Sequence, residues 1–91
     1  MNKRLKLTIF GQVQRVSFRY NAKTEAIRLG LVGWAKNEDD GTVRILAEGP
    51  KEKLNQLLAY CQIGPRLATI DSVQSDWEEG TGEFNNFEIR F

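Results

Sequence analysis

The sequence of 91 residues predicts an α+β fold, in which an antiparallel sheet carries two helices on one face. Two kinds of periodicity predict this class. Several short segments alternate apolar and polar residues with the period of two of a half-buried strand, whereas two longer segments repeat their apolar residues at helical spacing. A third observation is the order of these segments along the chain: strand, helix, strand, strand, helix, strand, with a short strand segment at the C-terminus.

The first strand and the first helix are joined by a loop that begins with glycine. Alternation with Lys6 and Thr8 predicts a strand that ends at Gly11. The apolar residues of this strand are Leu5, Leu7 and Ile9. After the loop, one face of a helix collects Phe18, Ala22, Ala26, Ile27 and Leu29. Gly30 is a suitable residue for the end of this helix.

A hairpin is predicted next. Residues 31–36 form a short apolar segment, and residues 42–48 alternate apolar with more polar side chains. Residues 37–41 between them end in Asp40-Gly41, a pair that favours tight turns. The two segments are therefore expected to pair as antiparallel strands.

The second helix follows Pro50, which suits a first helical turn because its missing N–H does no harm there. Its apolar stripe repeats at helical spacing and consists of Leu54, Leu57, Leu58 and Cys61. Gly64-Pro65 is expected to end it.

The C-terminal part is predicted as two strands separated by a turn. Residues 68–77 indicate an edge strand, and residues 78–86 an acidic, glycine-containing turn. In residues 87–91 three alternating apolar side chains are expected to hold the terminus in the sheet: Phe87, Ile89 and Phe91. The complete order is that of a ferredoxin-like βαββαβ sandwich, expected as a single domain over residues 1–91.

Composition narrows the function. The chain has 13 basic and 12 acidic residues, and the basic residues are scattered along it. Because nucleic acids and membranes usually bind a concentrated basic patch, neither is expected as a partner. A single cysteine excludes an intramolecular disulfide and suits a reducing compartment, and no apolar run resembles a signal peptide or a membrane span. We expect a cytoplasmic monomer.

The chain contains no histidine. Together with the single cysteine, this excludes zinc sites of the usual His/Cys type, Ser-His-Asp triads and Cys-His pairs. We therefore expect no metal and no cofactor. Any catalysis must use Arg, Lys, Asn, Ser, carboxylates, backbone amides or the substrate itself.

The loop at residues 11–19 has the features of an anion site. A strand that turns into a helix presents unpaired N–H groups and the positive end of the helix dipole at one point. The planar guanidinium of Arg19 can bond two phosphate oxygens at once. A phosphate is therefore expected at the helix start, held by the residues Gln14, Arg15, Val16, Ser17, Phe18 and Arg19.

The missing general acid limits the substrate. An alkoxide leaving group needs a proton, but a carboxylate, with a conjugate-acid pKa of roughly 4, leaves an acyl phosphate unprotonated. What remains to be supplied is an oriented water molecule. Asn37, at the end of the second predicted strand, can hold a water without repelling the phosphate, although an asparagine is also common before a turn.

Two motifs resemble a known family. Gly11-Gln12-Val13-Gln14-Arg15-Val16-Ser17-Phe18-Arg19 is similar to the G-x-V-Q-G-V-x-F-R signature of acylphosphatases. Gly33-Trp34-Ala35-Lys36-Asn37, with Asp40-Gly41-Thr42-Val43 and Glu48-Gly49-Pro50, resembles their second conserved region. The resemblance spans essentially the whole chain. It implies a ferredoxin-like fold and hydrolysis of acyl phosphates to carboxylate and inorganic phosphate, without metal or phosphoenzyme. It also implies that Arg19 and the 14–19 amides bind phosphate and that Asn37 orients the water.

One position departs from the signature, because Arg15 stands where the family has glycine. If the backbone there has a positive φ, a residue other than glycine costs about 1–2 kcal/mol and deforms the phosphate loop. If φ is negative, the cost vanishes and the added cation strengthens phosphate binding.

Two other functions compete with the enzyme. A phosphate-binding or metabolite-binding module without catalysis is the alternative if Arg15 impairs the loop. An RNA-binding domain shares the order of elements, but it needs exposed aromatic residues on its central strands, and residues 42–48 contain none.

Overall fold

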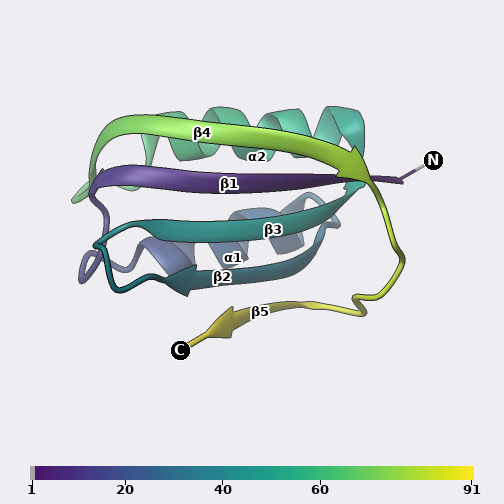
Figure 1. The fold of residues 1–91 in the computed structure, drawn as a ribbon, viewed down its shortest axis with the longest axis horizontal. Coiled ribbons are helices and arrows are strands. Elements are labelled where there is room, and N and C mark those ends of the chain that lie inside the picture. Colours follow the sequence, from purple (N-terminus) through teal and green to yellow (C-terminus); the bar gives the residue numbers. More distant parts are fainter. Residues whose placement is uncertain (1) are drawn as a thin grey trace.

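The computed structural model describes residues 2–91 and forms a five-stranded sheet covered by two helices (Figure 1). In chain order the elements are β1 (Asn2–Gln12), α1 (Phe18–Arg28), β2 (Val32–Asn37), β3 (Val43–Pro50), α2 (Lys51–Ile63), β4 (Thr69–Glu79) and β5 (Phe87–Arg90). The predicted α+β, ferredoxin-like order is confirmed. α2 begins one residue after Pro50, which ends β3 instead of occupying the first helical turn.

The strands lie in the order β4-β1-β3-β2-β5. β1 is antiparallel to β3 and β4, and β2 is antiparallel to β3, as expected. β5, however, runs parallel to β2, so the sheet is mixed. The reason is visible in Figure 1: the segment after β4 crosses the sheet at the end where β4 stops, so β5 starts at that end and runs in the direction of β2.

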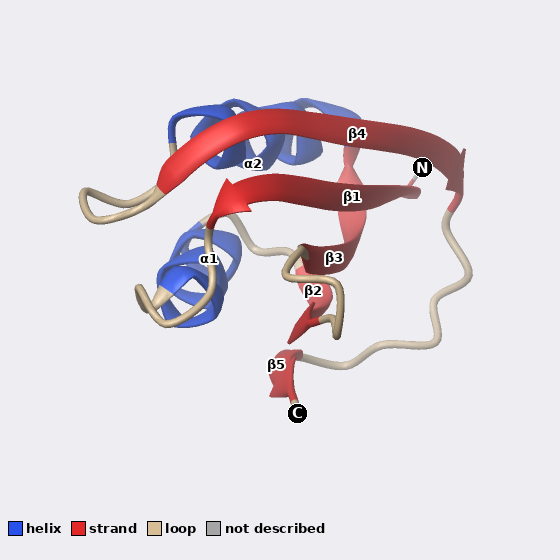
Figure 2. Ribbon diagram, turned by 60° about the vertical axis from the view of Figure 1, so that its left-hand side comes forward, coloured by secondary structure: helices blue, strands red, loops and turns tan. Residues whose placement is uncertain are grey.

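Both helices cover the same face of the sheet (Figure 1 and Figure 2). The apolar periodicity predicted from sequence supplies this layer. Its buried side chains include Leu5, Leu7 and Ile9 of β1, Phe18, Ala22 and Ala26 of α1, and Leu54, Leu57 and Cys61 of α2. Burial raises the pKa of the Cys61 thiol to about 12, so this cysteine is a packing residue and stays protonated.

Two predictions at the C-terminal end were wrong. Glu78 and Glu79 belong to β4 rather than to a turn. They are tolerated in this edge strand because β1 offers lysines within reach: Lys3, opposite Glu79, forms an ion pair with it, and Lys6 forms a diagonal ion pair with Glu78. Phe91 does not pack into the sheet but is 86% exposed, because the pairing of β5 with β2 ends at Arg90.

The crossing segment between β4 and β5 is attached to the sheet through Glu48, a buried residue of β3. Its carboxylate accepts hydrogen bonds from Arg4 Nε at 2.7 Å, from the N–H of Thr81 at 3.1 Å and from the N–H of Gly82 at 3.0 Å. Burial alone would raise the pKa of Glu48, but these donors together outweigh it and lower the pKa to about 2. The ionised carboxylate of Glu48 therefore fixes residues Thr81 and Gly82 of the crossing segment against the sheet.

No helix among residues 2–91 is both long and apolar enough to cross a bilayer.

Candidate active site

The loop that leaves β1 begins with a close approach between two strands. Pairing of β1 with β4 shifts register between Phe10 and Gly11, and Gly11 has φ 137°. A Cβ at Gly11 would lie 2.0 Å from the carbonyl oxygen of Thr69. Only glycine fits there, so Gly11 serves backbone geometry, and its role is to start the turn toward α1.

Residues 14–17 form the turn itself, and two of them have a left-handed backbone: Arg15 with φ 63° and Ser17 with φ 60°. Alternation between left-handed and ordinary residues directs successive N–H groups into one concavity, an arrangement that binds anions. Among residues 2–91, the N–H groups of residues 14–19 donate to no other main-chain group and to no side chain. Ser17 also makes no side-chain cap to α1. The loop thus presents free donors at a helix N-terminus.

The same finding decides the question raised by Arg15. Its φ is positive, so this arginine occupies the conformation that the glycine of the signature adopts without steric cost. The side chain of Arg15 is exposed at the edge of the site. The expected penalty of about 1–2 kcal/mol therefore applies.

Arg19 lies in the first turn of α1 and is held from the other side by the C-terminus. Its Nη1 donates a hydrogen bond to the carbonyl oxygen of Arg90 at 3.1 Å, and its guanidinium carbon lies 4.7 Å from the centre of the Phe91 ring. Within residues 2–91 no carboxylate pairs with Arg19. The guanidinium is therefore oriented, yet its charge is not neutralised.

Asn37 is the last residue of β2 and pairs with Val43 of β3. Its side-chain oxygen Oδ1 is buried and has no hydrogen-bond partner among the described residues. A buried acceptor left unsatisfied costs about 1–3 kcal/mol. We therefore expect Asn37 Oδ1 to accept a hydrogen bond from a water molecule or a ligand.

These residues meet around one cavity of about 220 Å³. It is lined by Val13, Arg15, Ser17, Phe18, Arg19, Tyr20 and Asn37. Five of the seven site residues predicted from sequence are in this set. The side chains of Gln14 and Val16 are not: Gln14 turns toward the β2–β3 turn, and Val16 packs against the core. Two arginines and no carboxylate line the cavity, so it favours an anion.

Sequence reasoning missed two features of this site: the contacts of the Gln14 side chain and the C-terminal pair of Arg90 and Phe91. The alternation of Phe87, Ile89 and Phe91 placed all three in the sheet.

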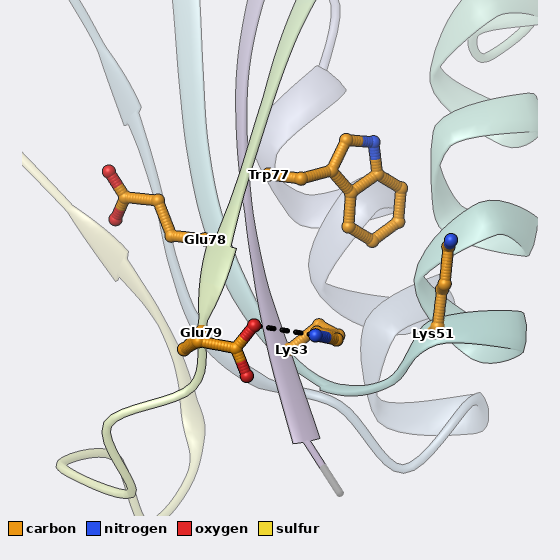
Figure 3. A pocket seen from close by; sticks show the side chains of 5 residues that line it. All are labelled: Lys3, Lys51, Trp77, Glu78 and Glu79. Atoms are coloured by element: carbon orange, nitrogen blue, oxygen red, sulfur yellow. Dashed lines mark hydrogen bonds and ion pairs between the residues drawn. The ribbon is translucent and has the colours of Figure 1, made fainter.

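A second hollow, of about 150 Å³, lies at the other end of β1 beside the start of α2 (Figure 3). Its lysine Lys3 already donates to Glu79 at 2.5 Å, and Lys51 lies 5.8 Å from the centre of the Trp77 ring. The carboxylates of Glu78 and Glu79 also line it. Paired lysines and nearby carboxylates make this hollow a poorer anion site than the loop.

Comparison with known proteins agrees with the motifs. A sequence profile described as Acylphosphatase matches residues 5–89. The acylphosphatase of Pelotomaculum thermopropionicum is 40% identical over 97% of this chain and 96% of its own length. That of Salinibacter ruber is 41% identical over 97% of this chain and 93% of its own. The crystal structure of acylphosphatase from Bacillus subtilis superposes with a TM-score of 0.94 at 31% identity, covering 98% of this chain and 99% of that one. The chain therefore belongs to the acylphosphatase family, hydrolases that act on acyl phosphates.

Proposed function

We propose that this chain hydrolyses its acyl phosphate substrate in the cavity between the 14–19 loop and Asn37, by direct attack of one water molecule on phosphorus. The lack of histidine and the burial of the single cysteine support a mechanism without a resident metal and without a covalent phosphoenzyme. Catalysis then consists of positioning and electrostatic stabilisation, which is what phosphoryl transfer chiefly requires.

The phosphoryl group binds at the loop. The free N–H groups of residues 14–19, which include those of Gln14, Val16 and Phe18, donate hydrogen bonds to its oxygens, and Arg19 contributes a charged donor pair. These donors become more effective as negative charge gathers on the equatorial oxygens in the transition state. Arg15, at the edge of the cavity, adds a second positive charge on the approach to the site.

The water is oriented by Asn37, and the buried, unpartnered Oδ1 of this residue is the observation that carries the proposal. An amide oxygen accepts one hydrogen of the water and leaves a lone pair of the water directed at phosphorus. Because the amide is neutral, it does not repel the phosphoryl oxygens. An aspartate in the same place would.

The hydrolysis needs no acidic side chain of the protein to protonate the leaving group. The bond between the water oxygen and phosphorus forms as the bond between phosphorus and the acyl oxygen breaks. The leaving carboxylate needs no proton, since its conjugate acid has a pKa of roughly 4. Both protons of the water end on the phosphate product, which leaves as inorganic phosphate.

Hydrolysis of benzoyl phosphate by wild type and Asn37→Ala tests the proposal. Loss of the water-orienting acceptor should lower kcat by about 100-fold or more, since misplaced reacting groups cost about that much. The inhibition constant for inorganic phosphate should stay nearly unchanged, because the loop donors remain. Asn37→Asp, which keeps the size but adds a charge, should lose activity as well.

Two results would count against this assignment. A large loss of phosphate affinity in Asn37→Ala would place the residue in phosphate binding instead. A wild-type chain that binds phosphate but does not hydrolyse benzoyl phosphate would favour the binding module without catalysis.

A further inference from the structure

We infer that the side chain of Gln14 is a positioning residue, which fixes Asn37 relative to the phosphate loop. Gln14 lies in the turn that carries the free N–H groups. Its Nε2 donates to the carbonyl oxygen of Glu38 at 2.7 Å and to that of Thr42 at 2.9 Å. These partners lie 24 and 28 residues further along the chain, so the bonds connect two segments that are remote in sequence.

The two carbonyl groups belong to the turn between β2 and β3. The N–H of Glu38 closes this turn by donating to the carbonyl of Thr42 at 2.9 Å. A primary amide has two N–H donors, and Gln14 gives one to each end of the turn. Within residues 2–91, no other hydrogen bond joins residues 13–17 to residues 37–42.

Asn37 adjoins the β2–β3 turn that the Gln14 side chain binds. It precedes Glu38 in the chain and pairs with Val43, which follows Thr42. The two bonded carbonyls therefore lie next to the Asn37–Val43 pair on its turn side, one on each strand. Rigid placement of the turn becomes rigid placement of the Asn37 amide, and of the water that it orients, against the phosphoryl group in the loop.

The expected consequence is a split between rate and binding. In-line attack is sensitive to misplacement of about 1 Å, which costs about 100-fold in rate. Phosphate binding uses main-chain N–H groups and Arg19, which the Gln14 side chain does not touch. Without this side chain, kcat should fall while affinity for inorganic phosphate persists.

A purely structural role predicts otherwise. The Thr42 carbonyl keeps the N–H of Glu38, and the Glu38 carbonyl keeps the N–H of Gly41 at 3.2 Å, so removal of Gln14 Nε2 leaves neither carbonyl without a partner. Loss of the two Gln14 hydrogen bonds costs stability of about 1 kcal/mol. A stabilising contact alone would lower the unfolding midpoint and leave kcat unchanged at temperatures where the protein is folded.

The test compares Gln14→Met, which keeps length but has no donor, with wild type. The matched control is Gln12→Met, because Gln12 is exposed and does not line the cavity. We expect Gln14→Met to lower kcat on benzoyl phosphate by about 10-fold to 100-fold. Inhibition by inorganic phosphate should stay within about twofold of wild type. Gln12→Met should match wild type in both.

A double-mutant cycle with Asn37→Ala separates this inference from the proposed function on which it rests. If Gln14 acts through Asn37, adding Gln14→Met to Asn37→Ala should change kcat by less than about twofold. Losses that multiply would overturn the Gln14 inference and leave the role of Asn37 intact. An undiminished kcat in Asn37→Ala would overturn both, and an unchanged kcat in Gln14→Met, with only a lower unfolding midpoint, would overturn the inference alone.

Discussion

Arg19 and Arg90 are joined by a hydrogen bond in which Nη1 of Arg19 donates to the main-chain oxygen of Arg90 at 3.1 Å. The guanidinium of Arg90 itself turns away, pairing with Glu88 and lying 5.0 Å from the centre of the Trp34 ring. The last strand of the chain therefore contributes a neutral acceptor and not a competing cation. This contact explains how an arginine at the start of α1 can be oriented and still keep its charge available for a substrate.

The first prediction concerns Arg19. Arg19→Ala should lower kcat/KM on benzoyl phosphate by about 100-fold to 1,000-fold, the usual effect of losing one well-aimed transition-state donor. Inhibition by inorganic phosphate should weaken in parallel, because substrate and product phosphate share this group. Arg19→Lys keeps the charge without the planar pair of donors and should recover only part of the loss. Undiminished phosphate affinity in Arg19→Ala would mean that the anion binds elsewhere.

The second prediction concerns the backbone at Arg15. Arg15→Gly removes the cost of a left-handed conformation, about 1–2 kcal/mol, but gives the unfolded chain more freedom, which costs about 0.5–1 kcal/mol. The variant should therefore be more stable than wild type by about 0.5–1 kcal/mol, the difference between these two terms. Urea unfolding at neutral pH measures it.

Arg15→Ala is the matched control, because it removes the side chain and keeps the strained backbone. Any change in phosphate inhibition shared by Arg15→Gly and Arg15→Ala reports the charge, whereas a gain in stability confined to Arg15→Gly reports the backbone. Lower stability of the glycine variant would show that the positive φ carries no penalty here.

The third prediction concerns pH and Glu48. Its pKa in the folded protein is about 2, below the ordinary value of 4.5. The unfolded chain therefore takes up this proton first as pH falls, so the stabilisation is complete above about pH 4.5 and is lost between about pH 4.5 and pH 2. Glu48→Gln should cost about 3 kcal/mol at neutral pH, the low end for breaking a buried ion pair, because Arg4 keeps some contact with water.

Urea unfolding of wild type and Glu48→Gln across this pH range checks the assignment. The difference in free energy of unfolding should shrink as pH falls and should be small near about pH 2. Glu52→Gln, at an exposed position of α2, is the control and should change stability by less than about 0.5 kcal/mol. A difference that stays constant with pH would show that packing of Glu48, and not its charge, attaches the crossing segment.

Much of this molecule was predictable from its residues. Alternation through Leu5, Leu7 and Ile9 and the helical stripe at Leu54, Leu57 and Cys61 report which side of each element is buried, and burial is what builds the two layers. The loop that ends at Arg19 carried enough chemistry to indicate a phosphate site, and two motifs in the right order indicated the family.

Other features depended on contacts between distant segments. The direction of β5 follows from where the chain crosses the sheet, and the exposure of Phe91 follows from where pairing ends. The positive φ of Arg15 is imposed by the loop around it, against the local preference of an arginine. The two bonds of Gln14 exist only because folding brings residue 14 to the turn after Asn37.

The sequence by itself determined the layers, the anion loop and the family, because periodicity and motif are local properties of the chain. Only the tertiary structure decided which residues line one cavity, that Arg19 is held by the Arg90 carbonyl, and that the side-chain oxygen of Asn37 is buried without a partner. The physical reason is that the sign of φ at Arg15, the direction of β5 and the partners of the side chains depend on long-range packing. No local pattern of residues encodes such packing.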